Sequence, residues 1–202
     1  MADDDLKIRA MRRLEDAFSP KSDAELLLRK LILPELCGRL WHTTSEDRFK
    51  SILMSGTILV KPDIPDDKRW STIAGEERYP YVRSIGGVSL FDFDQFNPSD
   101  FDHANPDSYS STHPNSSWST FIPYNETWGC SVWIEIDCAL PQLIRGPALL
   151  AKWRLDGCGR KFMPKIEAAH LGDIPRSAFR RAFLVRKDDS EFHHLPIDIF
   201  GI

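Results

Sequence analysis

The sequence predicts one α+β domain of ordinary globular composition. Its 202 residues are 42% hydrophobic and 28% charged, which suffices for one sizeable buried core. Some segments repeat apolar residues at helical spacing, whereas others alternate strictly between apolar and polar residues. No apolar run approaches the roughly 18 residues that a membrane-spanning helix needs. Because the start, Met1–Asp5, is acidic and unlike a secretory signal, we expect a soluble, cytoplasmic protein.

Two helices are predicted before the main domain. Residues 4–18 carry apolar side chains at the spacing of one helical face. Ser22 begins a capping-box pattern, which predicts a second helix over residues 23–36. We therefore predict a helical extension at 1–38 and the main domain at 39–202.

The main domain is predicted to begin with a strand that turns directly into a helix. Residues 39–44 read Arg-Leu-Trp-His-Thr-Thr, which favours a strand. Ser45 is typical of a helix N-cap, and Gly56 is typical of the residue that ends a helix. A short strand at 58–60 and a proline-containing connection over 61–85 are expected to follow.

The middle of the chain predicts two strands separated by a long loop. Residues 88–91 and 131–136 have strand patterns, and the second alternates apolar and polar side chains most clearly. Between them, residues 92–120 are rich in Asp, Asn, Ser and aromatic residues. A loop of that length within a compact domain is typical of a lid or a binding loop.

The last third of the chain predicts more strands than helices. The expected elements, in order, are a strand at 149–155, a strand at 165–169 with Glu167 at its centre, a turn at 172–175, a helical turn at 176–180 and a strand at 182–185.

The cysteines and histidines do not indicate a metal site. The four cysteines are widely spaced, with no CxxC pair, and we expect reduced and mostly buried thiols. They are Cys37, Cys130, Cys138 and Cys158. The six histidines include no HxH or HExxH spacing. We interpret His193 and His194 as a surface or turn pair.

The charge is distributed unevenly along the chain. The formal net charge is −4, but residues 1–144 sum to −8 and residues 145–187 to +8. A basic segment within an acidic protein indicates an anionic ligand nearby, either a pyrophosphate or a nucleic acid. The alternative is a solvated basic face without a ligand.

Two places carry the candidate chemistry. His42 lies where a predicted strand meets a helix N-terminus, which favours binding of sugars and phosphates. Its alternative role is a hydrogen bond to the backbone. Glu167, between Ile166 and Ala168, is expected to be a partly buried carboxylate and therefore a catalytic candidate. Its alternative role is a structural ion pair with a nearby basic residue.

Several of these segments together resemble the ADP-ribosyltransferase superfamily. Trp41–Thr44, followed by a helix that ends in Ile-Leu-Met-Ser-Gly at 52–56, is similar to the first strand and helix of that family. Residues 87–90 resemble its second core segment, and residues 166–175 resemble its late segment with the essential glutamate. The resemblance covers about residues 39–187.

The resemblance implies an ADP-ribosyltransferase-like split β-sheet core and a toxin-like transferase that uses NAD+ as substrate. NAD+ would lie in a cleft between two small sheets. His42, aided by Thr43 and Thr44, would bind the ribose on the adenosine side. Glu167 would bind the 2′-hydroxyl of the nicotinamide ribose and stabilise the oxocarbenium-like sugar, as carboxylates do in glycoside hydrolysis.

The resemblance also implies contacts around the rest of NAD+. Ser89 would line the cofactor site, Tyr81 would stack on nicotinamide, as Trp118 or Phe121 could, and Arg83 or a basic residue of 145–165 would meet the pyrophosphate. Relatives with the first-strand histidine often have tyrosine at the position of Ser89.

Arginine-modifying relatives usually carry a second glutamate two positions before the essential one, where this chain has Lys165. The acceptor, a nucleic acid or a protein, is therefore open.

Three other functions compete with this hypothesis. An NAD-dependent RNA 2′-phosphotransferase or an NAD glycohydrolase would use the same substrate. A non-enzymatic binding module would use the same scaffold with a structural Glu167. A metal hydrolase has no supporting histidine spacing in the sequence.

Overall fold

The computed structural model describes residues 33–69, 75–94, 130–156, 159–163, 166–186 and 193–195. The chain divides into two compact units, Met1–Glu35 and Leu36–Ile202, and the second contains the sheet described below. The predicted helix at 4–18 and most of the helix at 23–36 lie outside the described residues, as does the predicted loop beyond Asp94. Helix α3 (Leu33–Leu36) is the described end of the second predicted helix.

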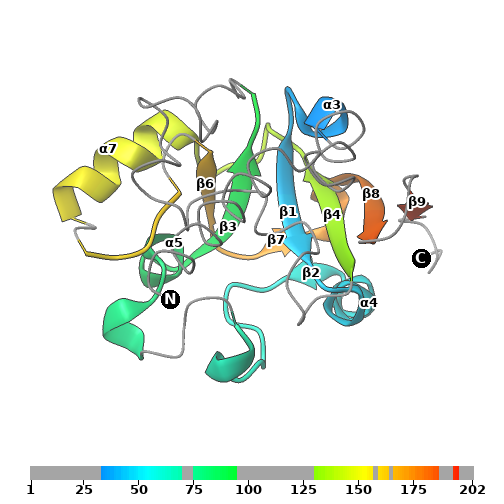
Figure 1. The fold of residues 1–202 in the computed structure, drawn as a ribbon, viewed down its shortest axis with the longest axis horizontal. Coiled ribbons are helices and arrows are strands. Elements are labelled where there is room, and N and C mark those ends of the chain that lie inside the picture. The colour runs from blue at the N-terminus through cyan, green and yellow to red at the C-terminus, as the bar shows by residue number, and fades with distance from the viewer. Residues whose placement is uncertain are drawn as a thin grey trace, which may run out of the picture. The chain divides into compact units, whose positions relative to one another are not determined.

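Seven strands form one sheet in which every pairing is antiparallel, and its order is β5-β6-β3-β1-β4-β8-β9 (Figure 1). These strands are β1 (Leu40–Thr44), β3 (Gly87–Asp92), β4 (Cys130–Ile136), β5 (Leu143–Ile144), β6 (Glu167–Leu171), β8 (Phe179–Arg186) and β9 (His193–Leu195). A second sheet pairs β2 (Thr57–Ile58) with β7 (Ile174–Pro175). The architecture is therefore α+β with an antiparallel sheet.

The helical elements are short. Besides α3 they are α4 (Glu46–Ser55), α5 (Tyr81–Ser84) and α7 (Gly146–Asp156), with 3₁₀ turns η2 (Asp66–Lys68), η3 (Glu76–Arg78) and η7 (Arg176–Ala178). None of the helices in the described ranges has the length and hydrophobicity to cross a membrane.

Helix α4 begins and ends where the local sequence predicts. The side chain of Ser45 accepts a hydrogen bond from the Arg48 amide at 3.5 Å, which caps the helix N-terminus. Gly56 ends the helix in the left-handed region, with φ of 69°, a conformation that glycine adopts at little cost. Phe49 and Leu53 are buried on the side that faces the sheet.

The two faces of the sheet have different cores. Alternating residues of β1, β3, β4, β6 and β8 form an aliphatic core with α4, and its strand members include Leu40, Leu90, Val132, Ile134 and Ala182. The residues between them in the same strands point to the other face of the sheet, and these include aromatic side chains. Trp41 contacts Phe183 edge-on at 5.0 Å, and Phe91 lies 5.4 Å from Trp133. The alternation predicted for 131–136 is confirmed by this division.

The sheet opens between β1 and β3. These strands pair over only two positions, Leu40↔Asp92 and Trp41↔Phe91, whereas β1 and β4 pair over five. Beyond Trp41 the two strands diverge, as Figure 1 shows. The expected two small sheets are therefore joined through β1 and β3 into one sheet, which separates only at the end that carries His42.

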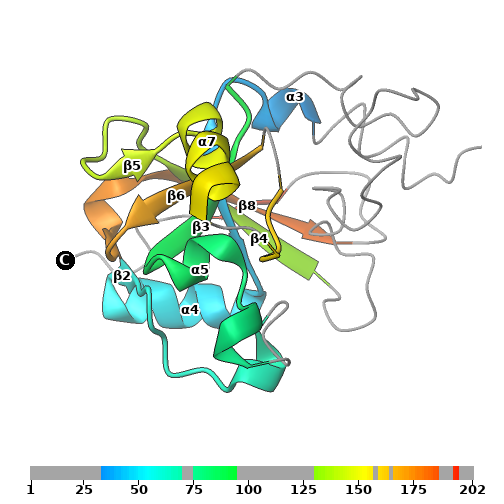
Figure 2. The same ribbon diagram turned by 90° about the vertical axis from the view of Figure 1, so that its left-hand side faces the viewer.

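Three predicted elements are corrected by the structure. Residues 149–155 are helical within α7, which packs along β6 (Figures 1 and 2). The run Ala-Leu-Leu-Ala-Lys-Trp-Arg-Leu has high helix propensity, and Pro147 stands in the first turn, where proline is tolerated. Glu167 begins its strand rather than occupying the centre. The connection over 61–85 contains η2, η3 and α5.

Two side-chain expectations are also corrected. Cys37 and Cys138 are exposed thiols, because both lie in turns at the end of an element rather than within the sheet. Residues 193–195 form β9 against β8, so His193 and His194 lie in a strand and not in a turn, while the alternative of a surface pair stays a prediction.

Candidate active site

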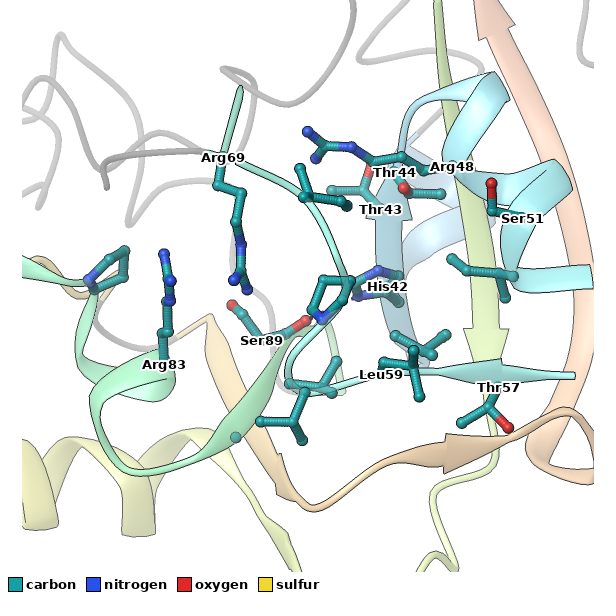
Figure 3. A pocket seen from close by; sticks show the side chains of 18 of the residues that line it. His42, Thr43, Thr44, Arg48, Ser51, Thr57, Leu59, Arg69, Arg83 and Ser89 are labelled. Atoms are coloured by element: carbon teal, nitrogen blue, oxygen red, sulfur yellow. Dashed lines mark hydrogen bonds between the residues drawn. The ribbon is translucent and has the colours of Figure 1, made fainter. Parts of the chain in front are cut away.

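A cavity of about 520 Å³ lies where β1 and β3 diverge. Its walls are the end of β1, helix α4, the first half of β3, the start of β6 and residues 60–69, which we call the strap (Figure 3). A volume of this size is typical of sites for small organic ligands. The lining brings together six of the seven site residues predicted from the sequence: His42, Thr43, Thr44, Arg83, Ser89 and Glu167.

Glu167 is completely buried and held by two hydrogen bonds. Its Oε1 accepts from the Ser89 hydroxyl at 2.7 Å, and its Oε2 accepts from the Met163 amide at 2.8 Å. Burial raises the pKa of Glu167 from 4.5 to about 7, although the two hydrogen bonds oppose this rise. Both the neutral and the ionised carboxyl are therefore populated near neutral pH.

The pairing of β3 with β6 brings Ser89 and Glu167 together across 78 positions of sequence. Phe91 lies opposite Glu167, and Ser89 lies opposite Ala169, so Ser89 is the diagonal neighbour of Glu167 on one face. Beside this pair, Gly87 lies where β3 packs tightly against α5 and β6. A Cβ there would lie 3.0 Å from Val82 Cγ1 and 3.3 Å from the His170 carbonyl oxygen.

His42 is fixed by the backbone of the same serine. Its Nδ1 lies 3.1 Å from the Ser89 carbonyl oxygen, which can only accept, so Nδ1 carries the proton in the neutral ring. Burial, together with the positive charge of Arg48, lowers the pKa of His42 to about 4, although the hydrogen bond to Ser89 opposes this change. The ring is therefore neutral at physiological pH, with Nε2 as a hydrogen-bond acceptor.

Three arginines line the cavity, and only one was predicted. Arg48 comes from the first turn of α4, Arg69 from the end of the strap and Arg83 from α5. Arg83 donates from Nη2 to Asp66 at 2.8 Å and lies 3.5 Å from the centre of the Tyr79 ring. The sequence holds a local indication that Arg48 belongs to the site, because it lies in the first turn of a helix after an N-cap. No local pattern distinguishes Arg69.

Two buried polar atoms of this cavity have no hydrogen-bond partner within the protein. They are Thr43 Oγ1 and Arg83 Nη1, and no other buried side-chain nitrogen or oxygen in the described part of the chain is in that position. Burial of an unsatisfied polar group costs free energy, so such atoms are usually satisfied by a ligand or by water. Both atoms therefore have room for a hydrogen bond to a polar ligand or to water in the cavity.

Tyr81 lies in the core instead of the cavity lining. It is 1% exposed and packs edge-on against Phe162 at 6.1 Å. Its hydroxyl donates to Asp156, and burial together with this bond raises the pKa of the phenol. The predicted stacking role is therefore unsupported at this site, where the aromatic lining residue among the described ones is Phe91. Trp118 and Phe121 lie outside the described residues.

The basic residues of 145–186 that the structure describes do not line the cavity. Arg145 binds Asp92 through two nitrogens at 2.6 Å each, and Arg181 binds Glu135 at 2.5 Å. Similar pairs join Lys152 to Asp156 and Arg180 to Asp137. Within the described ranges, no three His, Cys, Asp or Glu side chains gather as a metal site would require.

The sequence matches no protein-family model and no curated protein. A crystal structure of a mutant E. coli heat-labile enterotoxin is similar to 79% of this chain and to 76% of the enterotoxin chain, with 15% identity and a TM-score of 0.37. A likeness of this size carries no argument about function.

Proposed function

We propose that this chain is an ADP-ribosyltransferase-like enzyme that cleaves NAD+ and transfers ADP-ribose to an acceptor. The observation that carries the proposal is the arrangement of Glu167, Ser89 and His42 in one cavity. The serine hydroxyl binds the buried carboxyl, and the serine carbonyl orients the imidazole. A buried carboxyl of perturbed pKa within a cavity is typical of catalytic sites.

The chemistry follows from the ionised form of Glu167. When the glycosidic C–N bond of NAD+ breaks, nicotinamide leaves with the bonding electron pair, and the ribose carbon gains positive charge. A carboxylate beside that ribose stabilises the charge, while it accepts a hydrogen bond from the 2′-hydroxyl. The acceptor nucleophile then forms the new bond to the ribose carbon and loses its proton.

The other lining residues support binding of the sugars. Nε2 of neutral His42 would accept a hydrogen bond from a ribose hydroxyl, and Thr43 Oγ1 would gain the partner that the protein does not provide. The acceptor is a nucleic acid or a protein. Transfer to water instead would make the chain an NAD glycohydrolase.

One observation favours a second candidate, a non-enzymatic ligand-binding module. Glu167 is completely buried, and both of its oxygens are hydrogen-bonded within the protein. A carboxyl of this kind can serve the fold alone, in which case the cavity would bind a ligand without cleaving it.

Nicotinamide release from NAD+ distinguishes the two candidates. The purified protein is assayed alone and with DNA, RNA or cell extract, beside Glu167→Gln and the control Glu77→Gln, an exposed residue outside the cavity. We expect wild type and the control to release nicotinamide, and Glu167→Gln to be slower by roughly 100-fold or more.

Full activity in folded Glu167→Gln would contradict the proposed mechanism. No release by folded wild type under any condition, with ligand binding and melting temperature both lowered in Glu167→Gln, would favour the binding module. An addition that accelerates release identifies the class of acceptor.

A further inference from the structure

We infer that Arg48, Arg69 and Arg83 form a binding site for the pyrophosphate of a nucleotide ligand at the strap side of the cavity. The assignment of that nucleotide to NAD+ rests on the proposed function, whereas the anion site rests on the arginines themselves.

The three arginines converge although they come from three segments. They belong to helix α4, the end of the strap and helix α5, and all three line the same cavity. In Figure 3 the side chains of Arg69 and Arg83 extend from opposite sides toward the space beside Ser89, and Arg48 reaches in from the α4 side, beside Thr43 and Thr44. Guanidinium groups that converge in this way match the geometry of phosphate oxygens.

Arg83 is held so that one nitrogen is left for a ligand. Asp66 accepts from Nη2 at 2.8 Å, and the guanidinium carbon lies 3.5 Å above the Tyr79 ring. The Tyr79 hydroxyl in turn donates to Asp66, which fixes the carboxylate. Nη1 is buried and has no partner in the protein. A buried charged donor without an acceptor is costly, and an anionic ligand would supply the missing acceptor.

The electrostatics of the site also favour an anion. The pKa of Arg69 is lowered by burial first, and then by the neighbouring charges of Arg83 and Arg48, although Asp66 partly offsets them. Arg48 additionally donates to the Lys68 carbonyl, which joins α4 to the strap. A bound pyrophosphate would relieve the repulsion among the three cations. The carboxylates of Asp47 and Asp63 also line the cavity and limit its positive charge.

The position of the anion site defines the orientation of the ligand in the cavity. Thr43 Oγ1, the other buried atom without a partner, lies on β1, and Figure 3 places Thr43 between His42 and Arg48. The phosphates would therefore bind at the strap, while the sugars reach His42 and Glu167. Because the arginines hold the phosphates and not the reacting bond, their loss should raise KM and leave kcat nearly unchanged.

The test uses inorganic pyrophosphate and calorimetry on the full chain, with Arg83→Gln and Arg69→Gln. The matched control is Arg78→Gln, since Arg78 is exposed and outside the cavity. We expect wild type and the control to bind pyrophosphate equally. Each cavity variant should bind roughly tenfold more weakly, because a hydrogen bond to a charged group is lost. Arg83→Lys provides a second variant that keeps the charge but cannot reach Asp66 and the ligand together, and intermediate affinity is expected.

Kinetics separate this inference from the proposed function. With NAD+ as substrate, KM should rise roughly tenfold in both cavity variants, and phosphate-free nicotinamide riboside should respond to neither substitution. The protein could bind pyrophosphate, lose that binding in the cavity variants, and yet fail to cleave NAD+. That combination would support the anion site and reject the enzyme. Cleavage of NAD+ with the same KM in all variants would reject the anion site. Failure of folded wild type to bind millimolar pyrophosphate would also reject it.

Discussion

Two groups of basic residues in this domain differ in what faces them. The segment 145–187 carries a formal charge of +8, yet Arg145 and Arg181 face carboxylates of other strands. Arg69 and Arg83 come from the part of the chain whose net charge is −8, and both line the cavity, although Arg83 also pairs with Asp66. The net charge of a segment therefore gives the excess of one sign of charge, but it does not show which groups the charged side chains contact.

The difference has a physical origin. Strands β4 and β8 are neighbours, so their long polar side chains reach each other across the sheet, as Glu135 and Arg181 do. Arg48, Arg69 and Arg83 instead lie on elements that surround the opening between β1 and β3, where no strand fills the space. If this comparison is correct, substitutions in the first group should change stability, and substitutions in the second should change ligand binding.

At a fixed, neutral pH the largest effect on stability is expected at Arg145. Arg145→Gln removes both hydrogen bonds to the buried Asp92 carboxylate and should lower the free energy of unfolding by about 2–3 kcal/mol. Urea unfolding measures this change beside Arg154→Gln, an exposed residue of helix α7, which begins directly after Arg145; this substitution should cost less than about 0.5 kcal/mol. The KM for NAD+ should be unchanged. A change in KM without a loss of stability would contradict the comparison.

The next effect is a pH dependence centred on Glu167. Its pKa is raised on folding from 4.5 to about 7, so the stability that the neutral carboxyl contributes is complete below about pH 4.5 and lost as pH rises through about 7. The stability difference between wild type and Glu167→Gln should change by about 3 kcal/mol between pH 4 and pH 8, with wild type losing more.

Denaturant unfolding at several pH values measures the difference, in which the contributions of other groups cancel. A pH-independent difference would show that the pKa of Glu167 is not raised. If the chain cleaves NAD+ as proposed, turnover should rise with pH through about 7, because only the ionised carboxylate stabilises the ribose cation.

A smaller effect is expected at His42. His42→Ala removes the acceptor Nε2 and should weaken NAD+ binding about tenfold, or roughly 1.4 kcal/mol. Because the imidazole is neutral, with a pKa of about 4, this loss should be constant between pH 6 and pH 8. Titration of NAD+ into the inactive Glu167→Gln protein, with and without His42→Ala, measures it. Equal affinity in the two proteins would reject the assigned role.

The smallest effect belongs to an exposed pair of the basic segment. Lys152→Ala breaks an i,i+4 contact with Asp156 in which both side chains are more than 40% exposed, so it should cost about 0.5 kcal/mol or less. Urea unfolding and the KM for NAD+ check this together. A tenfold rise in KM would mean that the basic segment contacts the ligand after all.

Local sequence was sufficient for elements whose signals are short-range. The caps Ser45 and Gly56 define α4, and the alternation of 131–136 defines β4 and its buried face. The prediction of a strand over 149–155 is wrong, because a short apolar run fits a buried strand and a helix equally by periodicity alone. The helix propensity of that run and Pro147 were the local signals that distinguish the two.

By itself, then, the sequence determined α4, β1, β4 and the candidates His42 and Glu167, because capping, alternation and residue type act within a few positions. Only the tertiary structure decided that Ser89 binds Glu167 across 78 residues and that Arg48 and Arg69 join Arg83. These contacts depend on strand order and on how far β1 and β3 remain paired, which are properties of the folded sheet that no local pattern encodes.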